Sequence, residues 1–313
     1  MTQFTWTFDA PTGTYKQRAM SAKLFEAALE NSVFMDHVWP VEGFGRKMGE
    51  NVTLKRVSNL TEPTTADLTE GERIPEDQLS ISTTSITVNE IGRAVPYTSL
   101  SEDLGAIDVA NVTQKRLRNQ MTLVLDTKAA TAFKTAKIKY TPTGLASRSI
   151  ATSGTAGAAA TSNMNVYHVE EISDYLWDTL STPTINGDYV GIFRHLALRG
   201  IRRDPAWEEW HKYTDPSAKF NGETGRIEGV RFIDTNHNNA LGKIGNSSVL
   251  GEGVVFGEDG VAMAEVQTPE LRAAMPADFG RSKAVAWYGI LNFGIIWDTA
   301  NQGEARIVHV AST

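Results

Sequence analysis

Hydrophobic positions recur at helical spacing in three stretches of the chain, residues 15–31, 108–140 and 166–180. Apolar residues three and four positions apart are typical of an amphipathic helix with one buried face. We therefore expect a helix in each stretch. The second is the longest, and at 1.5 Å per residue it would extend roughly 45–50 Å. Asp108 stands at its start, where a side-chain oxygen caps the first free backbone amides.

Alternating polar and apolar residues predict strands on both sides of a long polar stretch. One strand begins at Val52, and a second covers residues 81–97. The apolar phase of the second strand changes once, between Val88 and Ile91. Because side chains alternate across a strand with period two, this change predicts a bulge or bend within residues 89–92.

The second half of the chain mixes short helices and strands. Apolar runs predict buried strands at residues 189–193, 230–233, 253–256, 284–297 and 307–310, and helices at residues 195–202 and 206–213. Residues 141–165 are rich in Thr, Ser, Gly and Ala, which indicates a linker. The order shows no regular alternation of strand and helix, so the fold class is predicted to be α+β.

The polar stretch between the first two strands, residues 59–80, is called the acidic loop below. It carries six acidic residues and a single basic one, Arg73, so its net charge is 1 − 6 = −5. A loop of about twenty residues without secondary structure is uncommon in a compact domain and is usually functional. Two interpretations stay open, a mobile surface loop or an arm that packs on a neighbouring subunit.

Charge is distributed unevenly along the chain. The helix expected over residues 108–140 has seven basic residues against Asp108 and Asp126, a net charge of 7 − 2 = +5. The whole chain has 30 basic and 37 acidic residues and a net charge of −7. That balance disfavours a generally basic nucleic-acid binder. A charged helix face is also most often simply solvated.

Composition and motifs exclude most kinds of catalytic centre. The 313 residues include no cysteine, which removes disulfides, thiolate nucleophiles and cysteine-containing zinc sites. No two of the six histidines lie within five residues of each other, and no phosphate-binding glycine loop or GxSxG motif occurs. The acidic residues beside Trp207 fit an ordinary amphipathic helix. We therefore expect no enzyme activity, no cofactor and no metal.

Neither a signal peptide nor a membrane span is expected from the sequence. The N-terminal residues lack a basic region followed by an apolar one. The longest apolar run, residues 284–297, has 14 residues, too few to cross a bilayer. A cytosolic protein without membrane contact is the expectation.

Several sequence stretches, taken together in their order and spacing, carry a resemblance to a known family. They are residues 51–56 (NVTLKR), 62–71 (EPTTADLTEG), 97–104 (YTSLSEDL), 188–192 (DYVGI), 203–207 (RDPAW) and 220–235 (FNGETGRIEGVRFIDT). The chain resembles tailed-phage major capsid proteins of the HK97-like fold, in the group related to the phage N4 major capsid protein. The resemblance covers nearly the whole chain.

The resemblance implies an HK97-like capsid fold with named parts. These are an N-terminal arm (residues 1–48), an extended E-loop hairpin (49–97), a peripheral domain with a long spine helix (98–165), an axial domain (166–280) and C-terminal strands (281–313) that return to the peripheral and axial domains. Fewer than fifty residues precede the E-loop, which is too few for a fused scaffolding domain.

The resemblance also implies a function and a set of partners. Such proteins assemble as hexamers and pentamers into an icosahedral virion shell around double-stranded DNA, which they contact without sequence specificity. Assembly takes place in the host bacterial cytoplasm, with separate scaffolding, portal and decoration proteins as expected partners. Two alternatives stay open: the shell protein of a cargo-holding bacterial compartment, and an enzyme with an unrecognised acid/base site.

The two charged segments predict a contact between subunits. We expect the acidic loop to dock against basic residues of the long helix in an adjacent copy. The candidate interface residues are Asp67, Glu70, Glu72, Arg73, Glu76, Lys115, Arg116 and Arg118. The founding member of the family joins an E-loop lysine covalently to a neighbour's asparagine. Here no lysine lies between Lys55 and Lys115, so no such crosslink is expected.

Overall fold

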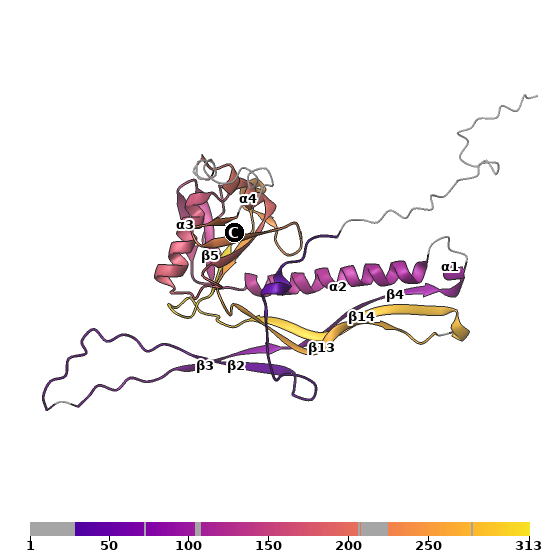
Figure 1. Ribbon diagram of the computed structural model, residues 1–313, viewed down its shortest axis with the longest axis horizontal. Coiled ribbons are helices and arrows are strands. Elements are labelled where there is room, and N and C mark those ends of the chain that lie inside the picture. Colours follow the sequence, from indigo (N-terminus) through magenta and orange to yellow (C-terminus); the bar gives the residue numbers. More distant parts are fainter. Residues whose placement is uncertain (1–28, 72, 104–107, 206, 208–224, 277) are drawn as a thin grey trace, which may run out of the picture.

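The computed structural model describes residues 29–71, 73–103, 108–205, 207, 225–276 and 278–313. Most of the helix predicted over residues 15–31, and all but Trp207 of the one over 206–213, lie outside these ranges. The described chain forms a rounded body, an elongated body and a long projecting loop (Figure 1).

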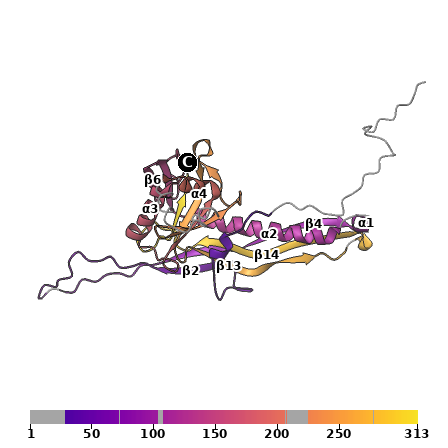
Figure 2. The same ribbon diagram turned by 45° about the horizontal axis from the view of Figure 1, so that its top comes forward.

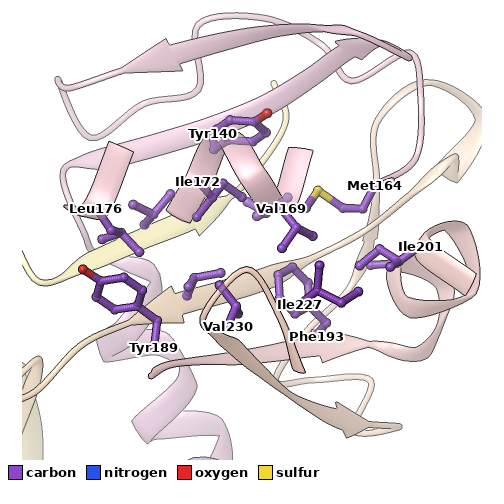
Figure 3. Packing of buried hydrophobic residues seen from close by; sticks show 14 of the residues in the cluster. Tyr140, Met164, Val169, Ile172, Leu176, Tyr189, Phe193, Ile201, Ile227 and Val230 are labelled. Carbon is purple, nitrogen blue, oxygen red and sulfur yellow. The ribbon is translucent and has the colours of Figure 1, made fainter. Parts of the chain in front are cut away.

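The rounded body is built on a seven-stranded sheet of order β6-β5-β15-β12-β7-β9-β8. Its strands are β5 (Ile138–Gly144), β6 (Ser147–Ala151), β7 (Tyr189–Arg194), β8 (Arg226–Ile227), β9 (Val230–Thr235), β12 (Gly253–Phe256) and β15 (Ile307–Val310). Helices α3 (Val166–Asp174) and α4 (His195–Arg202) pack on it, and α3 continues as a π-helical turn over Tyr175–Thr179. Side chains from both helices and the strands fill one core, in which Tyr140, Ile172 and Phe193 are almost wholly buried (Figure 3).

The elongated body pairs one helix with a long sheet. Helix α2 (Val109–Lys134) lies along a sheet of order β1-β13-β14-β4, whose strands are β1 (Trp39–Pro40), β13 (Val261–Ala273), β14 (Ser282–Ile295) and β4 (Asn89–Thr98) (Figure 2). Alternate residues of β14, among them Val285, Trp287 and Leu291, are buried in one cluster with Leu117 and Phe133 of α2. The alternation of strand side chains thus gives this sheet one covered face.

Shorter elements complete the chain. They are the 3-10 turns η1 (Phe34–His37), η3 (Asn246–Ser248) and η4 (Asp278–Gly280), the helix α1 (Ser99–Asp103), and the two-stranded sheet of β10 (Lys243–Ile244) and β11 (Leu250–Gly251).

Helix α2 begins where the sequence predicts and ends earlier. The Asp108 side chain accepts a hydrogen bond from the Asn111 amide at 3.0 Å, which confirms the cap. The helix stops at Lys134, and the chain then enters β5, which pairs in parallel with β15. The prediction of helix as far as residue 140 was therefore wrong, and Lys137 and Lys139 lie off the helix. Residues 109–134 keep five basic residues and Asp126, a net charge of 5 − 1 = +4.

The change of hydrophobic phase near Val88 marks a change of sheet. Strands β2 (Asn51–Val57) and β3 (Ile81–Thr87) form an antiparallel hairpin of their own. After Val88 the chain continues as β4, which pairs with β14 in the long sheet. A break in the second strand is thus confirmed, at Val88, one residue before the predicted interval. The apolar phase changes there because β3 and β4 belong to different sheets, and each buries its own set of alternate side chains.

The predicted linker over residues 141–165 was wrong in its first part. Residues up to 151 form the hairpin of β5 and β6 at one edge of the seven-stranded sheet. Thr141 is fully buried, and its hydroxyl donates to the Ala311 carbonyl at 2.9 Å. Small and hydroxylated residues, which suggested a loop, here satisfy their hydrogen bonds inside the fold. The strands predicted at 189–193, 230–233, 253–256, 284–297 and 307–310 are confirmed, with bounds that differ by a few residues.

Candidate assembly surfaces

The acidic loop projects from the elongated body between β2 and β3 (Figure 1). At its base the Ser58 amide donates to the Ser80 carbonyl at 3.2 Å, and its described residues form neither helix nor strand. Four large apolar side chains along it are between 55% and 65% exposed, namely Leu60, Leu68, Ile74 and Leu79. Leucine and isoleucine are among the residues most often buried, and a row of them in solvent indicates a surface for another chain.

The predicted acidic interface residues lie in this loop and are open to solvent. Asp67, Glu70 and Glu76 are exposed, whereas Glu72 lies outside the described residues. Arg73 pairs with Glu76, and both side chains are more than 70% exposed. An ion pair in that setting contributes about 0–1 kcal/mol. This pair therefore does not determine the conformation of the loop.

The predicted basic interface residues lie on the N-terminal half of α2. Lys115 and Arg118 are exposed and Arg116 is half-buried. In Figure 1 this half of α2 lies beside α1, at the end of the elongated body opposite the acidic loop. One subunit does not bring the two charged groups together, so a contact between them requires two copies of the chain.

A second exposed apolar group lies at the connection between β13 and β14. Met275 is 93% exposed and Phe279 is completely exposed. Phe279 also has a backbone φ of 53°, a left-handed conformation that is unusual for an aromatic residue. Sequence periodicity did not identify this tip, because β13 itself was not predicted.

A buried group of charged residues joins α2 to the seven-stranded sheet. We call it the charged joint; it consists of Lys134 at the end of α2, Lys139 in β5, Glu252 before β12 and His309 in β15. The Glu252 carboxylate contacts His309 Nε2 at 2.8 Å and Lys134 Nζ at 3.2 Å. It also accepts a hydrogen bond from the Gly242 amide at 2.7 Å. Lys139 Nζ lies 2.9 Å from His309 Nδ1 and 2.6 Å from the Lys134 carbonyl.

These contacts determine where the protons lie. Burial by itself raises the pKa of Glu252, but the hydrogen bonds from His309 and Gly242 and the charge of Lys134 outweigh it and lower the pKa to about 2. Burial lowers the pKa of Lys139 to about 8 and also lowers that of His309. Near neutral pH, His309 is uncharged, donates from Nε2 to Glu252 and accepts from Lys139 at Nδ1.

A second buried pair attaches the chain before η1 to α2. Asp126 and His237 are both almost fully buried, and His237 Nδ1 lies 2.8 Å from Asp126 Oδ2. The other oxygen of Asp126 accepts hydrogen bonds from the Val33 and Phe34 amides at 2.9 and 2.8 Å. A search for neighbouring histidines in the sequence could not find this pair, because its two members are 111 residues apart.

Both buried groups connect structural elements that are distant in the sequence. Within the ranges that the structure describes, no group of three or more His, Asp or Glu side chains could hold a metal ion. No described helix has the length and apolar character needed to cross a bilayer.

No protein-family model matches the sequence, and no curated protein does either. Solved structures do match it across nearly the whole chain. The head structure of Helicobacter pylori bacteriophage KHP40 aligns with a TM-score of 0.73 and 12% identity, covering 97% of each chain. The acid-stable capsid of H. pylori bacteriophage KHP30 aligns with a TM-score of 0.72 and 13% identity over 99% of each chain. For the cyanophage Pam1 capsid the TM-score is 0.68 and the identity 15%, over 100% of this chain and 99% of that one. The predicted HK97-like α+β fold is therefore confirmed.

Proposed function

We propose that this chain is the major structural subunit of a tailed-phage capsid and has no enzymatic role. Copies of it would associate as hexamers and pentamers into an icosahedral shell around double-stranded DNA, assembled in the cytoplasm of a bacterial host. The observation that carries the proposal is the end-to-end structural match, because it covers 97–100% of this chain with head and capsid structures.

The shape of the subunit supports the proposal. The acidic loop leaves more than half of the surface of Leu60, Leu68, Ile74 and Leu79 in solvent, and the described body of the same chain does not cover it. Burying a side chain of this size contributes about 1.5–3 kcal/mol. Four of them would contribute about 6–12 kcal/mol, before the cost of ordering the loop is subtracted. A neighbouring copy that covers them thus completes the fold.

Charge would then direct this association. Exposed ion pairs contribute about 0–1 kcal/mol each, less than the apolar contacts. Complementary charges act mainly on the association rate and on the choice of register. We therefore assign Asp67, Glu70 and Glu76 to steering toward the basic half of α2 in an adjacent copy.

We propose the part names of the HK97-like fold for this chain, with two adjustments. The E-loop hairpin ends at Thr87, because β4 pairs with β14 in the long sheet. Strand β13 belongs with the peripheral domain, because it pairs with β14 along α2. Membership of the N4-related group, and scaffolding, portal and decoration partners, are proposed on the sequence stretches alone.

Negative-stain microscopy of the purified full-length protein tests the proposed function. Shells, or rings of five and six subunits, are the expected particles. Uniform compact monomers at every protein and salt concentration tried would overturn the proposal. Particles filled with a protein cargo instead of DNA would identify a compartment shell.

The contribution of the acidic loop is tested with three matched variants. Leu68→Ser with Ile74→Ser should abolish assembly measured by light scattering. Asp67→Asn, Glu70→Gln and Glu76→Gln together should slow assembly and reduce its salt dependence, with little effect on the final yield. The control removes three exposed carboxylates elsewhere, Glu42→Gln, Asp178→Asn and Glu258→Gln, and should assemble like the parent chain. Equal rates for the loop-charge variant and the control would contradict the steering role.

A further inference from the structure

Helix α4 presents a basic face that the shell contacts described above do not use. Residues 194–203 contain four arginines and no acidic residue. Ala197, Leu198 and Ile201 turn into the core of the rounded body, so the arginines lie toward solvent. Lys243 of β10 borders the same face. We call Arg194, Arg199, Arg203 and Lys243 the basic surface.

The basic surface borders two adjacent hollows. Arg199 and Leu196 line both of them. The first hollow is also lined by Arg194, His195, Thr235, Asn236 and Lys243. Asn163, Arg203 and Asp204 are among the residues of the second. Arg199, Arg203 and Lys243 are exposed, while Arg194 is half-buried. The four cations therefore face one continuous, contoured surface.

The carboxylates nearest to this surface have other partners. Asp234 lies 2.6 Å from His195 Nδ1, and Asp204 accepts a hydrogen bond from the Val166 amide at 3.1 Å. Arg194 donates to two uncharged acceptors, the Leu241 carbonyl at 2.7 Å and the Asn238 side chain. Among the described residues, no carboxylate pairs with any of the four cations. Within the described part of the chain, the surface thus carries four positive charges without a paired carboxylate, whereas the whole chain has a net charge of −7.

Positive charges grouped without counterions favour a polyanion. Guanidinium groups match phosphate oxygens in shape and can donate two hydrogen bonds at once. The side-chain amide nitrogen of Asn236 adds an uncharged donor within the first hollow. No Phe, Tyr or Trp is among the described residues that line them. Aromatic platforms are what proteins use to stack the bases of single strands, so this lining suits a duplex whose bases stay paired.

We propose that the basic surface binds the phosphate backbone of duplex DNA and does not read its bases. This inference rests on the proposed capsid function, for which it names the part of the subunit that contacts packaged DNA. Each subunit would contact only a few phosphates, so the affinity of one subunit for DNA is low, and it falls as the salt concentration rises because binding releases counterions from the DNA. Many subunits would together hold the DNA without binding any segment tightly.

The test measures binding of a labelled 30-base-pair duplex to unassembled full-length protein by fluorescence anisotropy, between 25 and 200 mM NaCl. The surface variant is Arg199→Gln, Arg203→Gln and Lys243→Gln. Each phosphate contact contributes about 0.9 to the slope of log affinity against log salt. Loss of three should make the slope shallower by about 2.7, with at least a tenfold lower affinity at 50 mM NaCl. The control variant, Arg46→Gln, Lys47→Gln and Lys55→Gln, removes the same charge from exposed positions elsewhere and should bind like the parent chain.

The outcomes separate this inference from the function on which it rests. Equal binding by the parent chain and the surface variant would overturn the inference, as would a parent chain that does not bind at 25 mM NaCl. If the surface variant fails to form shells in an assembly assay that contains no DNA, the basic surface contacts another copy of the chain. That result would also overturn the inference. A parent chain that binds DNA through these residues but forms no shells would support the DNA contact and contradict the capsid function.

Discussion

The charged joint gives a quantitative prediction about the stability of the subunit. Glu252→Gln keeps the size of the side chain and removes the negative charge that Lys134 and His309 contact. Glu252 is 7% exposed, so the lost interactions are not replaced by water. Removing one partner of a buried charge pair costs about 3–5 kcal/mol, because the other charge stays buried.

The pKa of Glu252 provides a second estimate. It is lowered from 4.5 to about 2, and each pKa unit corresponds to about 1.4 kcal/mol, which gives about 3 kcal/mol. A folded pKa below the unfolded one stabilises the fold fully above pH 4.5, and this stabilisation is lost as the pH falls through about 2. The difference in unfolding free energy between parent and variant should therefore fall, by pH 3, to less than half of its value at pH 7.

Urea unfolding of unassembled subunits measures the unfolding free energy lost in the variant, at pH 7 and at pH 3. We expect a loss of about 3 kcal/mol at neutral pH, which for a chain of this length lowers the melting temperature by about 5 °C. Glu258→Gln is the control, since it removes an exposed carboxylate that lies two residues after β12 ends at Phe256. A loss below about 1 kcal/mol at pH 7, or an equal loss at both pH values, would refute the reasoning.

Three further predictions follow from other residues. In the parent chain, the unfolding free energy should rise between pH 8 and 10.5, because the folded chain releases the Lys139 proton at about pH 8 and the unfolded chain near 10.5. Lys139→Met should abolish this rise, which urea unfolding across the same pH range measures. The same pH profile in parent and variant would contradict the lowered pKa of Lys139. Phe133→Ala should cost about 3–5 kcal/mol by the same assay, because Phe133 is fully buried with its ring centroid 4.7 Å from that of Phe256; a loss near zero would show that the core can collapse around the gap. Mature particles should run as monomers in denaturing electrophoresis, because no lysine lies between Lys55 and Lys115; covalent ladders would show the opposite.

The exposure of the acidic loop was predictable from the sequence. Net charge and missing periodicity identified the acidic loop, and its Asp67 and Glu70 are exposed as a contact surface requires. The docking of this loop on an adjacent copy stays a prediction. The exposed tip at Phe279 was missed, because its flanking strand β13 has no simple alternation; its pairing with β14 contains two register shifts.

Local signals in the sequence determined where many elements begin and which face they bury. The Asp108 cap acts over three residues, and the alternation around Val88 needs only a few positions on each side. Such signals depend on nearby residues and not on segments distant in the chain. They were sufficient for the α+β class, and family resemblance supplied the HK97-like arrangement that the structure confirms.

Only the tertiary structure decided how those elements meet. Helix α2 ends at Lys134 because residues 138–140 pair in parallel with β15 and therefore form a strand. The charged joint brings together Lys139 and His309, which are 170 residues apart, and the basic surface likewise adds Lys243 to the arginines of α4. Periodicity and caps act over a few residues. The burial of a charge, and the partner that makes its burial tolerable, depend on packing between segments distant in the chain.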